Sequence, residues 1–178
     1  MADIDFGDVI YIERHEIINY KHFGIYSGNE RVIHYTKDNS GDSCDGIIRE
    51  TSLKKFLNGD RNLYICDFDN LGKRIRERKV DLPIAEGIIE VPVSFGYALI
   101  IRIFEKIFGE AEGKLYSPQE TVQRARDHIG TRQYDFFLNN CEHFAVWCKT
   151  GLSKSEQIDE FLDIILDGSM HSIKTVRI

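Results

Sequence analysis

The sequence predicts a mixed fold, with a β-sheet built from the first part of the chain and helices concentrated in the second part. Two observations lead to this prediction. Short runs rich in β-branched and aromatic residues, separated by turn signals, occur between residues 9 and 68. Capping patterns followed by one-sided apolar stripes, which are typical of amphipathic helices, begin after residue 116.

Five runs in the first part have the composition of strands: Val9–Glu13, Phe23–Ser27, Arg31–Thr36, Gly46–Glu50 and Asn62–Phe68. The pair Gly28-Asn29 between the second and third runs predicts a tight hairpin. This hairpin brings His22 and His34, twelve positions apart, into one region of the sheet. The register that sets the direction of their side chains stays open. A short helix is expected over Ser52–Leu57.

The second part carries three helix signals. The run Ser117-Pro118-Gln119-Glu120 combines a capping box with proline at the first helical position, so a helix is expected to begin there and end near Gly130. A second helix ends at Gly151, and its apolar stripe consists of Cys141, Phe144, Ala145 and Cys148. His143 falls off this stripe, which predicts a structural, capping or surface role. A third capping pattern predicts a helix over Ser153–Leu166.

Composition and charge are those of an ordinary globular domain. The chain has 178 residues, which favours a single domain with a sizeable core. Hydrophobic residues make up 42% and aromatic residues 11%, enough to build that core. The formal net charge of −6 disfavours nucleic acid as a partner, because binding to phosphates depends on clustered basic side chains.

The four cysteines indicate a reducing compartment. Cys44, Cys66, Cys141 and Cys148 form no C-x-x-C pair, and the acidic start Met1–Asp5 does not resemble a signal peptide. Nor does any run reach the roughly 18–20 apolar residues of a transmembrane helix. We therefore expect a cytoplasmic protein with reduced thiols, in which Cys66, Cys148 and Cys44 belong to the core.

The run Asn139-Asn140-Cys141-Glu142-His143-Phe144 carries the most specific chemistry. It places a thiol at the start of a predicted helix, where the positive end of the helix dipole favours thiolate. A histidine beside this thiol can take its proton, and a second polar group can orient that histidine. With His22 and His34 upstream, the sequence contains the parts of a cysteine-nucleophile acyl-transfer site.

These motifs resemble a known family. The run from Tyr20 to Gly28, followed by Val32-Ile33-His34, is similar to the histidine box of the lecithin:retinol acyltransferase-like family, which includes the H-Ras-suppressor-like phospholipid acyltransferases. The run Asn140–Phe144 resembles the nucleophile motif of that family. Tyr116-Ser117-Pro118 and Gly7-Asp8-Val9-Ile10 resemble its segment before the nucleophile and its opening strand. The likeness covers most of residues 7–151, apart from an interruption at about 67–115.

The resemblance implies an α+β, permuted papain-like (NlpC-type) fold. In such a fold an antiparallel sheet carries the two histidines and packs on helices, and the nucleophile lies at a helix N-terminus. It also implies a catalytic domain over residues 1–152 with an insertion at about 67–115. Residues 153–178 are then a C-terminal helical extension that packs on this domain or flanks it.

The resemblance also implies site residues and a reaction. Cys141 is the expected nucleophile, His22 the general base and His34 the residue that orients it, with Tyr20 as the candidate oxyanion donor. The expected reaction is acyl transfer from, or hydrolysis of, phospholipid esters through an acyl-Cys141 thioester. The expected partner is a phospholipid or another acyl ester, and neither a cofactor nor a metal is expected. The sequence leaves the oligomeric state open.

Two other functions stay open. Papain-like folds use the same Cys-His chemistry on amides, so the chain can be a cysteine peptidase or amidase. It can also be a regulatory domain that keeps the site residues without turnover.

The interruption contains an apolar segment with two interpretations. Val91–Ile101 carries no charge, and the apolar residues of 91–108 fall on one helical face. This segment is either a helix that makes peripheral contact with a membrane or a core helix of an enlarged domain.

Overall fold

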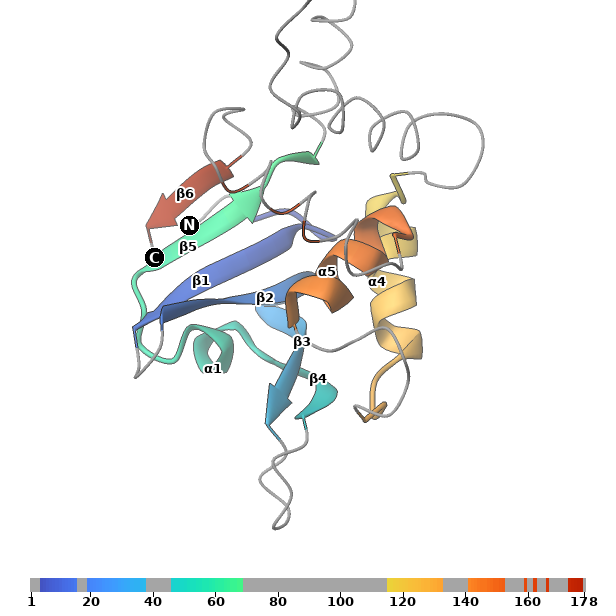
Figure 1. Cartoon of the computed structure of the whole chain (residues 1–178), viewed down its shortest axis with the longest axis horizontal. Coiled ribbons are helices and arrows are strands. Elements are labelled where there is room, and N and C mark those ends of the chain that lie inside the picture. Colours follow the sequence, from blue (N-terminus) through green and yellow to red (C-terminus); the bar gives the residue numbers. More distant parts are fainter. Residues whose placement is uncertain are drawn as a thin grey trace, which may run out of the picture.

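A computed structural model gives the structure of the chain and describes residues 4–15, 19–37, 46–68, 115–132, 141–152, 159, 162, 166 and 173–177. The elements in chain order are β1 (Val9–His15), β2 (Asn19–Gly28), β3 (Arg31–Lys37), β4 (Gly46–Ser52), α1 (Leu53–Leu57), β5 (Asn62–Cys66), α4 (Pro118–Asp127), α5 (Cys141–Thr150) and β6 (Ile173–Arg177). Strands dominate the first part of the chain, and α4 and α5 lie side by side against the sheet (Figure 1). The predicted α+β class is confirmed.

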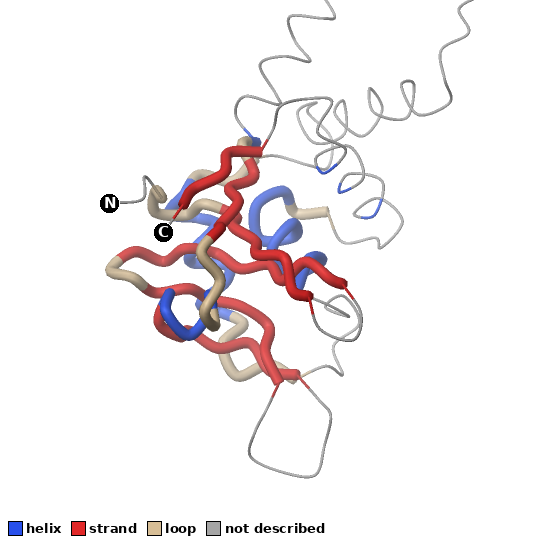
Figure 2. The backbone as a smooth tube through the Cα atoms, turned by 90° about the vertical axis from the view of Figure 1, so that its left-hand side faces the viewer, coloured by secondary structure: helices blue, strands red, loops and turns tan. Residues whose placement is uncertain are grey.

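All strand pairs of the sheet are antiparallel. The six strands, red in Figure 2, lie in the order β4-β3-β2-β1-β5-β6, so that β2 and β1 are in the middle and β3 is second from one edge (Figure 1). The predicted hairpin is confirmed, although its turn lies one residue later than the predicted Gly28-Asn29: Asn29 and Glu30, with φ of 50° and 55°, join β2 to β3. Two successive positive φ values match the type I′ turn, whose twist suits a hairpin.

Side chains alternate between the two faces of the sheet, and each face buries its own cluster. The α5 face packs against α4 and α5 through residues that include Val9, Tyr11, Phe23, Ile25, Ile33 and Ile48. The α1 face carries the second cluster, which consists of Ile10, Ile12, Val32, Phe56, Leu57, Leu63 and Ile65. Even-numbered residues of β1, β2 and β3 therefore belong to the α1 face.

The predicted helix starts are confirmed where the structure describes them. Ser117 caps α4: its side chain accepts from the Glu120 N–H, while the Glu120 carboxylate accepts from the Ser117 N–H at 2.9 Å. Pro118 occupies the first turn, as predicted. The helix expected after Cys141 is α5, and Cys148 is completely buried in it.

Two features differ from expectation. His143, predicted off the buried stripe of α5, is only 6% exposed, and its Nε2 lies 3.0 Å from Asp159 Oδ1. Asp159 thus lies on that side of the helix, a contact that periodicity within α5 does not reveal. In addition, Ile173–Arg177 in the predicted helical extension is strand β6, paired with β5.

Several predictions lie outside the described residues. They are the core position of Cys44, nearly all of the insertion at 67–115 with its apolar segment 91–108, and most of the helix predicted over 153–166. Within the part of the chain that the structure describes, no helix is long and apolar enough to span a bilayer.

Candidate active site

Two histidines and a threonine form a chain of hydrogen bonds on the α1 face. His22 on β2 places its Nε2 2.8 Å from Nδ1 of His34 on β3. His34 Nε2 is in turn 2.8 Å from the Thr51 hydroxyl on β4. His34 is 3% exposed and Thr51 8%, whereas His22 is only partly buried. The prediction that the hairpin brings the two histidines together is confirmed.

The short helix α1 packs on the two imidazoles. The Phe56 ring lies 5.2 Å from the centroids of both imidazoles, stacked on His22 and edge-on to His34. Gly24 makes this close packing possible: a Cβ there would lie 2.6 Å from Val32 Cγ1 and 3.0 Å from Phe56 Cε2. The strand can therefore approach α1 only because this position has no side chain.

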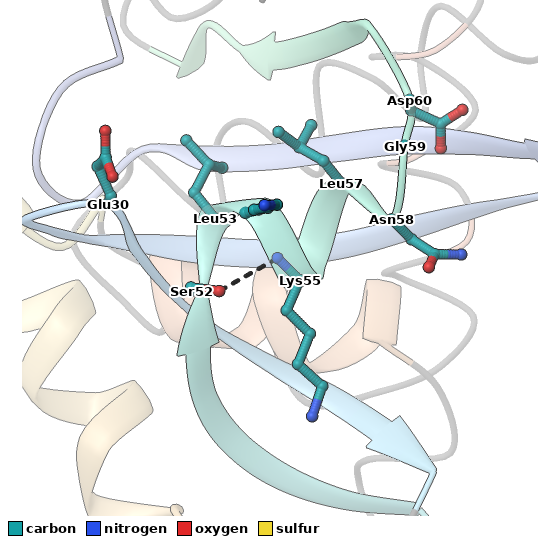
Figure 3. Close-up of a pocket in the computed structure, with 9 residues that line it drawn as sticks. Glu30, Ser52, Leu53, Lys55, Leu57, Asn58, Gly59 and Asp60 are labelled. Atoms are coloured by element: carbon teal, nitrogen blue, oxygen red, sulfur yellow. Dashed lines mark hydrogen bonds between the residues drawn. The ribbon is translucent and has the colours of Figure 1, made fainter.

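Both ends of α1 are secured. Ser52 caps its start by accepting from the Lys55 N–H at 3.2 Å (Figure 3). At its end, the Arg14 guanidinium donates to the carbonyls of Phe56 at 2.6 Å and Leu57 at 3.0 Å. These carbonyls are among those that a helix leaves without intrahelical donors. An open hollow of about 690 Å³ runs along α1 and the β2–β3 turn, but neither histidine of the pair nor Cys141 lines it (Figure 3).

The thiol of Cys141 lies at the edge of β2, level with His22. Its Sγ donates to the Lys21 carbonyl at 3.7 Å and accepts from the Phe23 N–H. The pairing of β2 with β3 stops at Ile25↔Ile33, so β3 does not pair with this part of β2. The sulfur thus bonds to the backbone on both sides of His22.

The direction of these bonds follows from the strand geometry. The Tyr26 backbone bonds to Asp8 and Gly7, which lie just before β1. Backbone groups of alternate residues point to opposite edges, so those of Lys21 and Phe23 turn away from β1, toward β3. Cys141, in the first turn of α5, consequently bonds to the edge of β2 that β3 leaves unpaired. No hydrogen bond joins the sulfur to the His22 ring among the described residues.

Burial decides the resting charges. It lowers the pKa of His22 to about 4, with a further contribution from the Arg14 cation. Burial also lowers the pKa of His34 to about 3, assisted by His22, Lys55 and Arg14. At neutral pH both imidazoles are therefore uncharged.

The thiol follows the same rule. Burial raises the pKa of Cys141 to about 11 and outweighs the Phe23 N–H and the N–H groups at the start of α5, which lower it. The helix terminus does favour thiolate, as expected, but desolvation is the larger effect. The thiol of Cys141 and the imidazoles of His22 and His34 are therefore all uncharged at neutral pH.

The other candidates take clear positions. Tyr20, the oxyanion candidate, is 45% exposed, and its ring meets the edge of His22 at a centroid distance of 6.5 Å. Cys66 and Cys148 are buried and free, and burial raises the pKa of both. No group of three metal-ligating side chains comes together among the described residues.

Thr51 and Phe56, which contact the two histidines, were not predicted from the sequence as site residues. Neither residue lies in a motif, and both reach the histidines only because β4 pairs with β3 and leads into α1. The one local signal was the capping pattern of Ser52, which predicts where α1 begins but not what it covers.

Comparison with known proteins decides the family. Residues 2–154 match the family model described as "Lecithin retinol acyltransferase". The chain belongs to this family. It is similar to lecithin retinol acyltransferase of Mus musculus, with 27% identity over 89% of this chain and 60% of the relative. The human protein of the same name is 24% identical over 89% of this chain and 60% of its own length.

The chain is also similar to a plant protein. The protein LEAD-SENSITIVE 1 of Arabidopsis thaliana is 30% identical over 82% of this chain and 57% of its own length. The chain thus spans about 60% of the length of the curated relatives that it matches. The family-model match covers both histidines and Cys141, as well as Thr51 and Phe56.

The lowered pKa values predict that the protein loses stability in acid. The unfolded chain takes up protons on His22 and His34 as the pH falls below 6.5, whereas the folded protein does so only near about 4 and about 3. Unfolding therefore binds protons in this window, and the free energy of unfolding falls as the pH falls, by about 3 kcal/mol for His22 alone. Urea unfolding followed at several pH values between 7 and 4 measures this slope.

A His34→Gln variant should have a shallower slope than the wild type over the same range. Thr121→Val on α4, which removes no ionisable group and lies away from the histidines, serves as the control and should keep the wild-type slope. Identical slopes for the wild type and His34→Gln would contradict the assignment.

Proposed function

We propose that this chain is a thiol-dependent acyltransferase or hydrolase that acts on phospholipid esters through an acyl-Cys141 thioester. His22 is the general base, His34 orients it, and the catalytic unit lies in residues 1–152 with the permuted papain-like arrangement. The single observation that carries the proposal is the position of the Cys141 sulfur. It bonds the backbone of Lys21 and Phe23, on either side of a histidine that is already bonded to a second one.

The first half-reaction forms the thioester. The Cys141 sulfur attacks the ester carbonyl while its proton passes to the free nitrogen of His22, Nδ1, and an oxyanion forms on the carbonyl oxygen. When the oxyanion collapses, the bond to the leaving oxygen breaks, and that oxygen takes the proton from His22. The acyl group then remains on sulfur.

The second half-reaction reverses these roles. A hydroxyl acceptor or water attacks the thioester carbonyl and gives its proton to His22. The bond to sulfur breaks, and the departing sulfur recovers the proton from the imidazolium. His34 accepts a hydrogen bond from His22 throughout and thereby steadies the imidazolium. A neutral imidazole supplies less charge for this than the carboxylate of a serine triad.

The neutral resting state is compatible with this mechanism. With the pKa of His22 lowered to about 4, the base is unprotonated at neutral pH. Since the pKa of Cys141 is raised to about 11, its proton has to leave as the new bond forms. Hydrogen bonds in substrate-free sites are often long and shorten in the complex, so the lack of a direct bond between thiol and ring does not oppose the proposal.

Tyr20 is the proposed oxyanion donor. Its ring is near His22 and exposed, so a phenol O–H there can meet a substrate that approaches from solvent. An oxyanion donor acts by aiming a hydrogen bond at the charge that develops in the transition state.

Family membership supports lipid esters over amides. The mouse relative is named for lecithin, a phospholipid, and for retinol, an alcohol, which together describe ester chemistry. A direct test compares a diacyl phosphatidylcholine with an analogue in which one ester is replaced by an amide, and with a panel of peptide amides. We expect cleavage of the ester lipid alone. Preferential cleavage of peptide bonds would point to a peptidase, and no turnover of any substrate would point to a non-catalytic domain.

A further inference from the structure

The Thr51 hydroxyl is the buried end of the hydrogen-bonded series His22–His34–Thr51. Thr51 lies on β4, directly opposite Val32 in the register, and is 8% exposed. Its Oγ1 is 2.8 Å from His34 Nε2 and 3.4 Å from the Ser52 carbonyl. A hydroxyl has one proton and can donate it to only one of these two partners. This choice sets the direction of the hydrogen bond between Thr51 and His34 and of the one between His34 and His22.

In the first direction every N–H and O–H of this network points from His22 toward Ser52. His22 Nε2–H donates to His34 Nδ1, His34 Nε2–H donates to Thr51, and Thr51 donates to the Ser52 carbonyl. Three hydrogen bonds are made, and His22 keeps a lone pair on Nδ1.

In the opposite direction Thr51 donates to His34 Nε2, and His34 Nδ1–H donates to His22 Nε2. Only two hydrogen bonds remain, and the Ser52 carbonyl loses its donor in this chain. His22 then carries its proton on Nδ1, which has no acceptor among the described residues. A partly buried donor without an acceptor costs free energy, so the first direction is favoured.

We propose that Thr51 is a positioning residue that sets the tautomers of both histidines and keeps Nδ1 of His22 unprotonated for the Cys141 thiol. The Thr51 hydroxyl accepts a hydrogen bond from His34 because its own O–H donates to the Ser52 carbonyl. The backbone at the start of α1 thereby determines which nitrogen of His22 can act as a base, two histidines away. The role of Thr51 in catalysis rests on the proposed function, whereas the tautomer of His22 requires no substrate.

The tautomers can be read directly from the full chain labelled with ¹⁵N-histidine. Two-bond ¹H–¹⁵N correlation spectra distinguish Nδ1–H from Nε2–H, and His22→Gln and His34→Gln variants assign the signals. The wild type should show the Nε2–H form at both His22 and His34. Thr51→Val, which keeps the shape but removes the hydroxyl, should populate the Nδ1–H form of His22, while Thr51→Ser should retain the wild-type pattern.

The reactivity of Cys141 provides a second readout. Alkylation of Cys141 by iodoacetamide near neutral pH, followed by mass spectrometry of its peptide, should slow about tenfold in Thr51→Val and recover in Thr51→Ser. The matched control is Thr121→Val on α4. Thr121 is fully buried and its hydroxyl donates to the Ser117 carbonyl at 2.9 Å, away from the histidines, so this variant should react like the wild type.

A wild-type protein with His22 in the Nδ1–H form would overturn the proposal, and so would a Thr51→Val variant with unchanged tautomers and alkylation. If Thr51→Val does not fold, the wild-type and Thr51→Ser spectra decide, and an Nδ1–H form of His22 in either is the overturning result. If the tautomers and alkylation rates are as expected but the protein transfers no acyl group, the positioning role of Thr51 is supported. The proposed function is then contradicted.

Discussion

Replacing Cys141 by alanine is expected to lower acyl release from phosphatidylcholine by at least about a thousandfold and to eliminate the acyl-enzyme. The reason is position: Cys141 is the described thiol whose sulfur bonds to the β2 backbone next to His22, whereas Cys66 and Cys148 are buried more completely. Incubation with a labelled phospholipid followed by mass spectrometry should find the acyl group on the Cys141 peptide of the wild type.

Two variants make this test specific. Cys148→Ala removes a buried thiol seven residues further along the same helix and should leave the acyl adduct in place, although it loses some packing. Cys141→Ser keeps a hydroxyl at the nucleophile position, and hydroxyls are far weaker nucleophiles than thiols near neutral pH. Adduct formation at the wild-type level in Cys141→Ser would exclude this sulfur as the nucleophile.

Replacing His22 by glutamine is expected to lower kcat by about a hundredfold to ten-thousandfold, the range for a general base. His34→Gln should be less severe, because His34 acts on the reaction only through its 2.8 Å contact with His22. Steady-state kinetics on the phospholipid substrate, with folding checked by circular dichroism, measure both losses. KM should change little, since neither ring is assigned to substrate binding.

His143→Gln provides the matched control for the two histidines. His143 is two residues from Cys141 and is buried like His34, but its Nε2 bonds to Asp159 rather than to either histidine of the pair. Its substitution should leave kcat within a few-fold of the wild type. Equal and small losses for His22→Gln and His34→Gln would contradict the division of roles between them.

The local sequence predicted most of the described elements. Strands β1 to β5, a hairpin between β2 and β3, the cap of α4 and the start of α5 all depend on neighbouring residues, and each was found. Strand β6 was missed although Ile173, Thr175 and Val176 are β-branched, because residues 153–178 were expected to form a helical extension. Its partner β5 lies more than a hundred residues earlier, so the sequence around β6 does not reveal which strand it pairs with.

Some residues of the candidate site were likewise predicted from the sequence, and others were found only in the structure. Resemblance to a family identified His22, His34 and Cys141, and the hairpin explained why the first two meet. The resemblance carried no information on Thr51 or Phe56, because their contacts with the histidines cross from one strand to the next and from α1 to the sheet. Such contacts depend on register, and a shift by one residue would turn these side chains to the other face.

By itself, the sequence determined the kinds and order of the elements, a thiol at the start of a helix and two imidazoles in one hairpin, since short-range spacing sets all of these. Only the tertiary structure decided that the sulfur rests at the edge of β2, bonded to a carbonyl 120 residues away in the chain. It also decided the charges: a helix N-terminus favours thiolate, but burial of Cys141 opposes it more strongly and raises the pKa to about 11. Burial is a property of the packed molecule, because it depends on residues that are distant along the chain.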